Sequence, residues 1–338
     1  MILALTIKDV SKSAGVSIAS VSRYINKTGN VSSQTAKKIE LAIEELKFRP
    51  NIIGRSLRTG KSKLIGVMLP SLSNPVFSDA MTGIQQLARE YGYTILITNT
   101  EYDSSYEESA IEALLSNGVD GLILTVSCEQ DNIFLKKLDK EKVPYVLLYN
   151  NTLNPNRSIV SIDNAKASED VAKAFLDLGH TRFGMISISQ NLSDRAILRQ
   201  QAFVKYLKKR GFNNTKLIEI DSTEANIEEE LKSIYSKANP PTALFCSNDA
   251  IALNVISLLK RINIQVPNNV SVIGFDGIKI GELIEPTLST VVQPSIDMGK
   301  EAFKQLLSLI IDNSTPQTIL LPYKLKMAGT TSTPPKNQ

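Results

Sequence analysis

An alternation of short apolar runs with amphipathic segments fills most of this 338-residue chain and constrains its fold more than any other feature. The apolar runs have the length of buried strands, and the segments between them carry apolar residues at helical spacing. The expected strands cover 64–69, 94–98, 121–126, 145–148, 183–188, 216–220, 243–246 and 270–274. The expected helices cover 77–91, 105–116, 165–178, 195–210, 227–238 and 249–262. Such alternation predicts parallel sheets with helices on both faces.

The alternation comes in two series, which divide near Ser161. Because a single hydrophobic core stops growing beyond about 250–300 residues, we expect two doubly wound lobes. Ligands of such folds bind at the carboxyl ends of the strands, and a cleft between two lobes is a natural pocket. The body of the chain therefore predicts a small-molecule site between two lobes.

Charge separates the first 63 residues from the rest. They hold twelve Lys and Arg against four Asp and Glu, a net charge of +8, whereas the remaining residues carry a net charge of −4. A basic segment attached to a mildly acidic body favours a polyanionic partner for that segment alone. A solvated basic face without a partner explains the charge equally well.

The basic segment predicts three short helices. Thr6 and Asp9 have the spacing of a capping box, and Gly15 is expected to end the first helix. Ser17 is expected to cap the second helix and Ser32 the third. The third helix would place Ile39, Leu41, Ala42, Ile43 and Leu46 on its apolar side. Helix, glycine turn and helix is the arrangement that places a second helix in the DNA major groove.

Signatures of enzymes and of metal sites are missing from the sequence. His180 is the only histidine, which leaves little for a Ser-His-Asp triad or a zinc site. We find no phosphate-binding glycine motif. Cys128 and Cys246 each lie in an apolar stretch, so we expect buried thiols without a disulfide. We therefore expect neither an enzyme nor a resident cofactor or metal.

The hydropathy pattern gives the expected location. No apolar run is long enough to cross a bilayer, and the first residues lack the basic lead and the apolar length of a signal peptide. We expect a cytoplasmic, nucleoid-associated protein that does not contact a membrane.

Five colinear motifs near the start resemble the headpiece of the lactose-repressor/galactose-repressor (LacI/GalR) family. They are Thr6-Ile7-Lys8-Asp9-Val10, Ala14-Gly15-Val16-Ser17, Val21-Ser22-Arg23, Val31-Ser32-Ser33-Gln34-Thr35 and Arg49-Pro50-Asn51. The resemblance implies an α/β chain with an all-α helix-turn-helix headpiece and two doubly wound parallel-sheet lobes of the periplasmic-binding-protein type. The headpiece would cover 1–48 and a hinge 49–62. The N-terminal lobe would combine 63–162 with 293–322, and the C-terminal lobe 163–292 with 323–335.

The resemblance also implies which headpiece residues contact DNA. On the second helix these are Ser17, Ile18, Ala19, Ser22 and Arg23. Arg23 can pair with both acceptors of a guanine, whereas Ile18 and Ala19 offer apolar contact, for instance to a thymine methyl group. Further family positions that touch phosphates or base edges are Thr6, Asn26, Asn30, Val31 and Thr35. Capping or turn formation is the alternative role, and for Thr6 and Asn30 the two are evenly balanced.

The linker is similar to the family's hinge. Leu57 matches a leucine that wedges into the minor groove, and Arg55 and Arg58 would face phosphates. Asn51 begins this segment. Glycine replaces the usual alanine at Gly54, which costs about 0.8–1 kcal/mol of helix propensity. Gly54→Ala is therefore expected to tighten operator binding.

In the body, three polar residues match family positions that contact the effector. Arg199 supplies fixed donors, Asp276 accepts from two hydroxyls, and Asn248 does both, so together they suit vicinal hydroxyl groups. A helix cap for Asn248 and a turn aspartate for Asp276 are the alternatives. Asn74, Val76 and Phe77 would form the first-lobe wall, and Phe77 would either stack on a sugar face or belong to the core.

Several departures prevent copying the ligand of any one relative. Tyr149-Asn150 stands where many relatives have Asp-Arg, and Gly277 stands where many have a second acid or asparagine. Ala202 replaces a usual glycine, and Ser222 a frequent ring-stacking aromatic.

The resemblance predicts a transcription regulator, most often a repressor, that binds a palindromic double-stranded DNA operator as a homodimer. A small-molecule effector, most simply a sugar, would control it allosterically. The nearest alternative uses a purine or a phosphocarrier-protein corepressor. A transport sugar-binding protein with the same two lobes is a different class, which the basic headpiece disfavours. No leucine heptad occurs at 332–338, so a coiled-coil tetramer is not expected.

Overall fold

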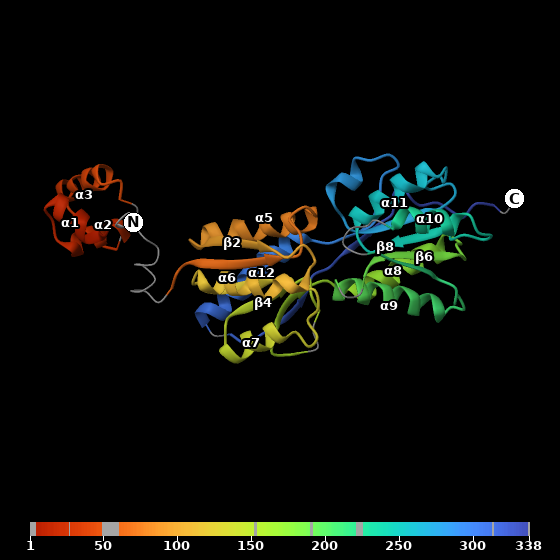
Figure 1. Cartoon of the computed structure of the whole chain (residues 1–338), viewed down its shortest axis with the longest axis horizontal. Helices are drawn as coiled ribbons and strands as arrows, with labels where there is room; N and C mark the ends of the chain where they lie inside the picture. The colour runs from red at the N-terminus through yellow and green to blue at the C-terminus, as the bar shows by residue number, and fades with distance from the viewer. Residues whose placement is uncertain are drawn as a thin grey trace. The chain divides into compact units, whose positions relative to one another are not determined.

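The computed structural model describes residues 5–26, 28–48, 61–151, 154–189, 192–220, 226–312 and 314–336. It contains two compact units, Met1–Lys63 and Leu64–Gln338 (Figure 1). Among the described residues, no helix has the length and apolar character needed to cross a membrane.

The first unit consists of three helices, α1 (Ile7–Ala14), α2 (Ile18–Asn26) and α3 (Ser33–Glu45). Gly15 ends α1 with a φ of 61°, a left-handed conformation that glycine adopts without strain. The Ser17 hydroxyl accepts from the Ser20 backbone N–H at 3.1 Å, and the Ser32 hydroxyl accepts from that of Thr35 at 3.3 Å. The predicted helix starts and the glycine stop are therefore confirmed.

A small apolar core holds these helices together. Val10, Val21 and Ile39 are fully buried, and Phe48, which the sequence did not single out, also lies in this core. The prediction for Leu41 was wrong, because its side chain is 60% exposed. Leu41 lies only two positions after Ile39, about 200° further around the helix, and so faces away from the core.

The first lobe of the second unit contains a six-stranded parallel sheet. Its strand order is β11-β5-β4-β3-β1-β2. The strands are β1 (Leu64–Leu69), β2 (Thr94–Asn99), β3 (Gly121–Leu124), β4 (Tyr145–Leu148), β5 (Ser158–Ser161) and β11 (Thr318–Leu320). The helices are α5 (Pro75–Glu90), α6 (Glu107–Ser116), α7 (Ile133–Glu141) and α12 (Ser295–Asp312), with a 3₁₀ turn η1 (Ser104–Tyr106). Every residue of β3 and β4 is buried, as expected for strands covered on both faces.

The second lobe repeats this architecture. Its strand order is β12-β10-β9-β8-β6-β7, parallel except for the antiparallel edge strand β12. The strands are β6 (Phe183–Ile188), β7 (Lys216–Ile220), β8 (Ala243–Cys246), β9 (Ser271–Asp276), β10 (Ser289–Val292) and β12 (Lys324–Lys326). The helices are α8 (Asn164–Asp177), α9 (Asp194–Lys208), α10 (Ile227–Tyr235) and α11 (Asp249–Arg261), with a 3₁₀ turn η2 (Lys279–Glu282). The predicted pair of doubly wound lobes is confirmed.

The chain passes between the lobes three times. The crossings lie between β5 and α8, between β10 and α12, and between β11 and β12 (Figure 1). Each lobe is therefore completed by a segment from late in the chain. This connectivity brings the ends of β1, β8 and β9 to the junction of the lobes.

Both cysteines are free thiols. Cys246 is buried in β8, as predicted, but Cys128 is only half-buried. The reason is that Cys128 follows the end of β3, in a loop and not in the strand.

Candidate functional site

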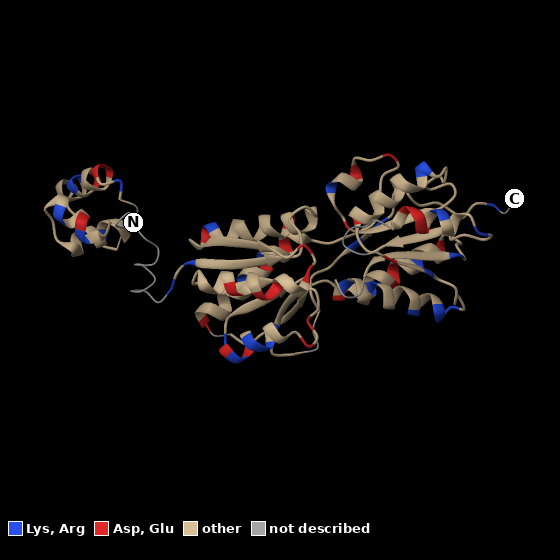
Figure 2. Cartoon of the chain, viewed as in Figure 1, with Lys and Arg blue, Asp and Glu red and all other residues tan. Residues whose placement is uncertain are grey.

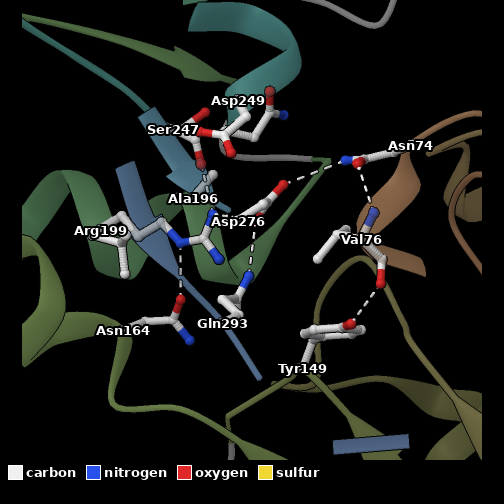
Figure 3. Close-up of polar contacts among 12 residues, drawn as sticks. Asn74, Val76, Tyr149, Asn164, Ala196, Arg199, Ser247, Asp249, Asp276 and Gln293 are labelled. Atoms are coloured by element: carbon white, nitrogen blue, oxygen red, sulfur yellow. Dashed lines mark hydrogen bonds and ion pairs between the residues drawn. The ribbon is translucent and has the colours of Figure 1, made fainter. Parts of the chain in front are cut away.

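A pocket lies between the two lobes at the carboxyl ends of β1, β8 and β9 (Figure 3). All six residues predicted to contact an effector line it: Asn74, Val76, Phe77, Arg199, Asn248 and Asp276. Its other lining residues are Tyr102, Tyr149, Ile188, Ser193, Arg195, Ala196, Ser247 and Gln293. Each lobe supplies part of the wall.

Arg199 projects from α9 with its guanidinium fixed on several sides. Its Nε donates to Asn164 Oδ1 at 2.8 Å, and its Nη1 donates to the Ser247 carbonyl at 2.6 Å. The guanidinium also lies over the Phe275 ring, 3.5 Å from the centroid. Burial lowers the pKa of Arg199 to about 10, against the opposing effect of Asp276. The side chain stays positively charged at neutral pH and is held ready to donate hydrogen bonds.

Asp276 ends β9 and gathers contacts from three directions. Its Oδ1 accepts from Gln293 Nε2 at 2.8 Å and lies 3.9 Å from Arg199 Nη1. Its Oδ2 accepts from Asn74 Nδ2 of the first lobe at 3.5 Å. Burial raises its pKa to about 6, although the charge of Arg199 opposes this shift. Its φ of 122° is strained for a residue other than glycine, as found at functional sites.

Asn248 has the structural role that its sequence context allowed. Its Oδ1 accepts from the backbone N–H of Ile251 at 2.8 Å and so caps α11. The helix-cap alternative is therefore correct for this oxygen, and the residue also lines the pocket. Asp276, in contrast, is the last residue of a strand and not a turn aspartate.

The first-lobe wall is built at the start of α5. Asn74 caps this helix by accepting from the Val76 backbone N–H at 3.2 Å. The Val76 carbonyl accepts from the Tyr149 hydroxyl at 2.9 Å. Phe77 packs edge-to-face on Tyr149 with 5.4 Å between ring centroids, and it belongs to the hydrophobic core while touching the pocket. Both proposed roles of Phe77 are thus compatible with its position.

Several lining residues were not predicted. Ser247 directly follows β8, a predicted strand whose carboxyl end was a usable signal, whereas Gln293 follows β10, which was not among the predicted strands. Arg195 precedes Arg199 by one helical turn, and the i, i+4 spacing on one helix face was a usable signal. Tyr102 lay in a loop after β2 and gave no local signal of its role.

A second set of contacts joins the lobes at the N-terminus of α9. The Asp194 backbone N–H donates to the Ser127 carbonyl at 2.8 Å, and Asn150 Nδ2 donates to Asp194 Oδ2, also at 2.8 Å. Arg195 Nη1 donates to the Val126 carbonyl at 3.0 Å. Burial raises the pKa of Asp194, against the neighbouring charge of Arg195. We call these contacts of Val126, Ser127, Asn150, Asp194 and Arg195 the α9 latch.

In the first unit, α2 presents the predicted DNA-reading residues to solvent. Ser17, Ile18, Ala19 and Arg23 are exposed, and Ser22 is half-buried. An apolar side chain such as Ile18, which is 50% exposed, is available for contact with a base methyl group. Arg23 Nε donates to the Ala19 carbonyl at 3.3 Å, and no hydrogen bond within the described residues is found for its two outer nitrogens. Figure 2 marks the positions of Lys and Arg along the ribbon of this unit.

The remaining predicted DNA contacts have mixed local roles. Thr6 donates its backbone N–H and its hydroxyl to Asp9 Oδ2, at 2.8 and 2.7 Å. Asn26 Nδ2 donates to the Ser22 carbonyl at 2.8 Å. Asn30 is exposed, and Thr35 accepts a hydrogen bond from Ser32. Val31 packs partly against the small core. Asn51, Gly54, Arg55, Leu57, Arg58 and Ser222 lie outside the described residues.

The single histidine of the sequence has a structural role in the second lobe. His180 is buried, and its ring nitrogens lie 3.0 Å from Thr242 Oγ1 and 2.9 Å from the Ser332 carbonyl, so it fastens the C-terminal segment to the second lobe. Within the described ranges, no three His, Cys, Asp or Glu side chains are placed to hold a metal ion.

Two family models match the chain. The model described as bacterial regulatory proteins, lacI family, matches residues 6–51, which include the three helices of the first unit. The model described as a periplasmic binding protein-like domain matches residues 172–331. The two matches fall on the two parts of the chain that the fold separates.

Curated relatives match over nearly the whole chain. The transcriptional regulator KdgR of Bacillus subtilis (strain 168) is 31% identical over 331 residues, covering 95% of this chain and 96% of the relative. The transcriptional repressor PurR of Photobacterium profundum is 31% identical over 314 residues, covering 91% and 93%. These relatives are named as regulators of transcription and not as enzymes.

Among solved structures, the lac repressor dimer bound to operator and the anti-inducer ONPF is similar, with a TM-score of 0.85. It is 25% identical and covers 97% of this chain and 99% of its own. Because full-length relatives are above 30% identical and both parts of the chain are matched, the chain belongs to the LacI family of bacterial regulatory proteins.

Proposed function

We propose that this regulator is a cytoplasmic repressor, which binds a palindromic operator as a dimer and releases or holds it according to a polyhydroxylated effector in the inter-lobe pocket. The observation that carries this proposal is the buried pair of Arg199 and Asp276 in the second lobe. Asn74 of the first lobe donates to Asp276 at 3.5 Å, so this contact joins the lobes. An effector that binds Arg199 and Asp276 either replaces this contact or adds to it.

The chemistry of the pocket favours a sugar over a purine. Arg199 and Gln293 offer donors, Asp276 offers acceptors, and Asn248 keeps an amide group in the same wall. Vicinal hydroxyls satisfy both kinds of group at once, because each hydroxyl donates and accepts. Phe77 and Tyr149 in the pocket wall pack edge-to-face on each other, and Phe275, whose ring the Arg199 guanidinium covers, is fully buried and does not line the pocket.

Coupling to DNA follows from differential binding to two lobe arrangements. A ligand shifts an equilibrium only as far as its affinity differs between the two states. Two headpieces must address two half-sites at a fixed helical spacing, so a change between the lobes of a dimer alters how well both bind together. The exposed α2 face supplies the base contacts, and the net charge of +8 in the first 63 residues supplies the attraction to phosphates.

The test starts with selection of an operator from random duplexes by the full-length protein. Operator affinity is then measured with sugars and purines added one at a time, and we expect a sugar to change this affinity at least tenfold. Arg199→Gln should abolish that response, because the amide cannot replace the guanidinium contacts. Arg210→Gln, an exposed arginine that follows the same helix, is the matched control and should keep it. Failure to prefer any sequence over bulk DNA under all conditions would disprove the proposal.

A further inference from the structure

The effector pocket is the inner of two adjoining compartments. A second cavity opens beside it, and the two share Asn74, Tyr102, Ile188 and Asn248 as common walls. The inner compartment offers about 30 Å³ and the outer about 510 Å³. Both lie in the second unit, and both take walls from each lobe.

The inner compartment is too small for a whole sugar ring. A single water molecule already needs about 10–15 Å³ of such space, so 30 Å³ holds a pair of hydroxyl-sized groups. Its walls are the fixed Arg199, the carboxylate of Asp276 and the amide of Gln293. This compartment therefore suits the hydroxyl-bearing edge of a ring and not its full body.

The outer compartment has the size and lining of a conventional ligand pocket. Its 510 Å³ lies within the range of about 300–1,000 Å³ that small-molecule sites occupy. Leu72, Leu192 and Ile220 supply apolar surface, while the exposed Asn99 and Glu101 supply polar groups. A second ring with one apolar face and a polar rim matches these walls.

The segment between the compartments is held in a strained turn. Glu101 and Tyr102 follow β2 with φ values of 52° and 62°, both in the left-handed region. The Tyr102 backbone N–H donates to the Pro70 carbonyl at 3.1 Å, which ties this turn to the end of β1. Two consecutive non-glycine residues in that region indicate a conformation maintained by its surroundings. The turn places Tyr102 in the wall of both compartments and Glu101 in the outer one alone.

We propose that the effector is a two-unit glycoside, such as a disaccharide, with the hydroxyl edge of one ring in the inner compartment and its second unit in the outer compartment. The Tyr102 ring stands beside the bond that joins the two units. This inference rests on the proposed function, because it assigns the effector of the same pocket. It excludes a monosaccharide as the ligand that the full site is built to recognise.

The test compares disaccharides with their component sugars. Maltose, cellobiose, lactose, sucrose and trehalose are titrated against glucose, galactose and fructose, by calorimetry and by the shift in Tm of the full chain. At least one disaccharide should bind ten times more tightly than either of its components. Ala250→Trp fills the outer compartment from an exposed position, and it should weaken that disaccharide at least tenfold while changing monosaccharide affinity less than twofold.

Two further variants secure the result. Leu72→Ala removes outer apolar surface at a side chain that is 56% exposed, so it should fold normally and weaken the disaccharide alone. Lys173→Trp places the same bulk at an exposed position on α8, outside both compartments, and should change nothing. Equal binding of a monosaccharide, insensitivity to both outer variants, or no binding of any sugar would overturn the inference. A disaccharide that binds through the outer compartment without altering operator affinity would uphold it and disprove the proposed regulation.

Discussion

At the scale of single residues, the pocket depends on charges kept away from water. Arg199 is 6% exposed and Asp276 is also 6% exposed, so each loses most of its hydration. Their separation of 3.9 Å and the amide of Gln293 offset part of that loss. For Asp276 these contacts do not fully compensate for the lost hydration, and burial therefore raises its pKa to about 6. A ligand hydroxyl that donates to Asp276 would stabilise its charged form.

This shift predicts how effector binding depends on pH. A carboxylate accepts from two hydroxyls, whereas the protonated acid must use one oxygen as a donor. Effector affinity should therefore fall about tenfold per pH unit below pH 6 and level off above pH 7. Calorimetric titrations between pH 5 and 8 measure this dependence of effector affinity on pH. Asp276→Asn should bind weakly at every pH, and a flat wild-type profile from pH 5 to 7 would contradict the assignment.

Asp249 shows a different use of a buried acid. It does not line the pocket, but its Oδ2 accepts from the backbone N–H groups of Gly277 and Ile278, at 2.7 and 2.8 Å. Its Oδ1 accepts from Thr290 Oγ1 at 2.6 Å. Burial and the charge of Asp276 raise its pKa to about 8, against these three hydrogen bonds. It fixes the loop that follows Asp276, and so positions the pocket without touching a ligand.

Its replacement tests that role. Asp249→Asn keeps an acceptor and the side-chain shape, and the acid it replaces is largely neutral at pH 7, so the free energy of unfolding should change by less than about 1 kcal/mol. Asp249→Ala leaves the part-buried N–H of Gly277 and the buried N–H of Ile278 without their acceptor and should cost at least about 2 kcal/mol. Urea unfolding at pH 7 distinguishes the two. Equal stability of both variants would argue against a role in holding the loop.

At the scale of elements, the first lobe depends on a close helix crossing. Helices α5 and α12 pack together through Gly83 and Gly299. A Cβ atom at Gly299 would lie 2.0 Å from the Ala80 carbonyl oxygen, and one at Gly83 would lie 1.9 Å from that of Ile296. Since both neighbours are backbone atoms, no side-chain rotation relieves the clash. The crossing therefore permits only glycine at these two positions.

Gly299→Ala should consequently push the helices apart. Overpacking of this kind typically costs about 1–3 kcal/mol, and a backbone neighbour places this site at the upper end. The expected result is a lower Tm of the full chain. Lys304→Ala on the exposed face of α12 is the control, and it should change stability by less than about 0.5 kcal/mol. A Gly299→Ala protein as stable as the wild type would show that the crossing adjusts freely.

Elements with strong local patterns were predictable, and those without them were not. The buried strands β3 and β4 read as continuous apolar runs, and Gly15 marked the end of α1. In contrast, β11 and β12 have three residues each and are partly exposed at sheet edges, so their sequences carry no strand period. Helix α12 was overlooked because it follows a crossing and so breaks the strand-helix alternation within one lobe.

The candidate site was predictable only where resemblance supplied the positions. Arg199, Asn248 and Asp276 came from motifs, and the structure brings them into one pocket. Tyr102 was not predicted, because its position depends on the turn after β2 and on the backbone contact with the end of β1, which no local pattern encodes. The α9 latch was not predicted for the same reason, since it pairs Asn150 with Asp194 across the junction of the lobes.

At the scale of the whole second unit, the α9 latch should govern how readily the lobes open. Asp194→Ala removes the side-chain contacts to Asn150 and Arg195 but keeps the backbone bond to Ser127, so about 1–2 kcal/mol of lobe closure is lost. That loss corresponds to roughly a tenfold shift toward open lobes, and effector affinity should fall accordingly. Small-angle scattering should give a larger radius of gyration than the wild type without effector, and a saturating effector should restore the wild-type value.

Asp177→Ala, an exposed acid at the end of α8, controls for the loss of one negative charge and should match the wild type. Unchanged scattering and unchanged affinity in Asp194→Ala would mean that closure is set inside the pocket, by Asn74 and Asp276, and not at the latch.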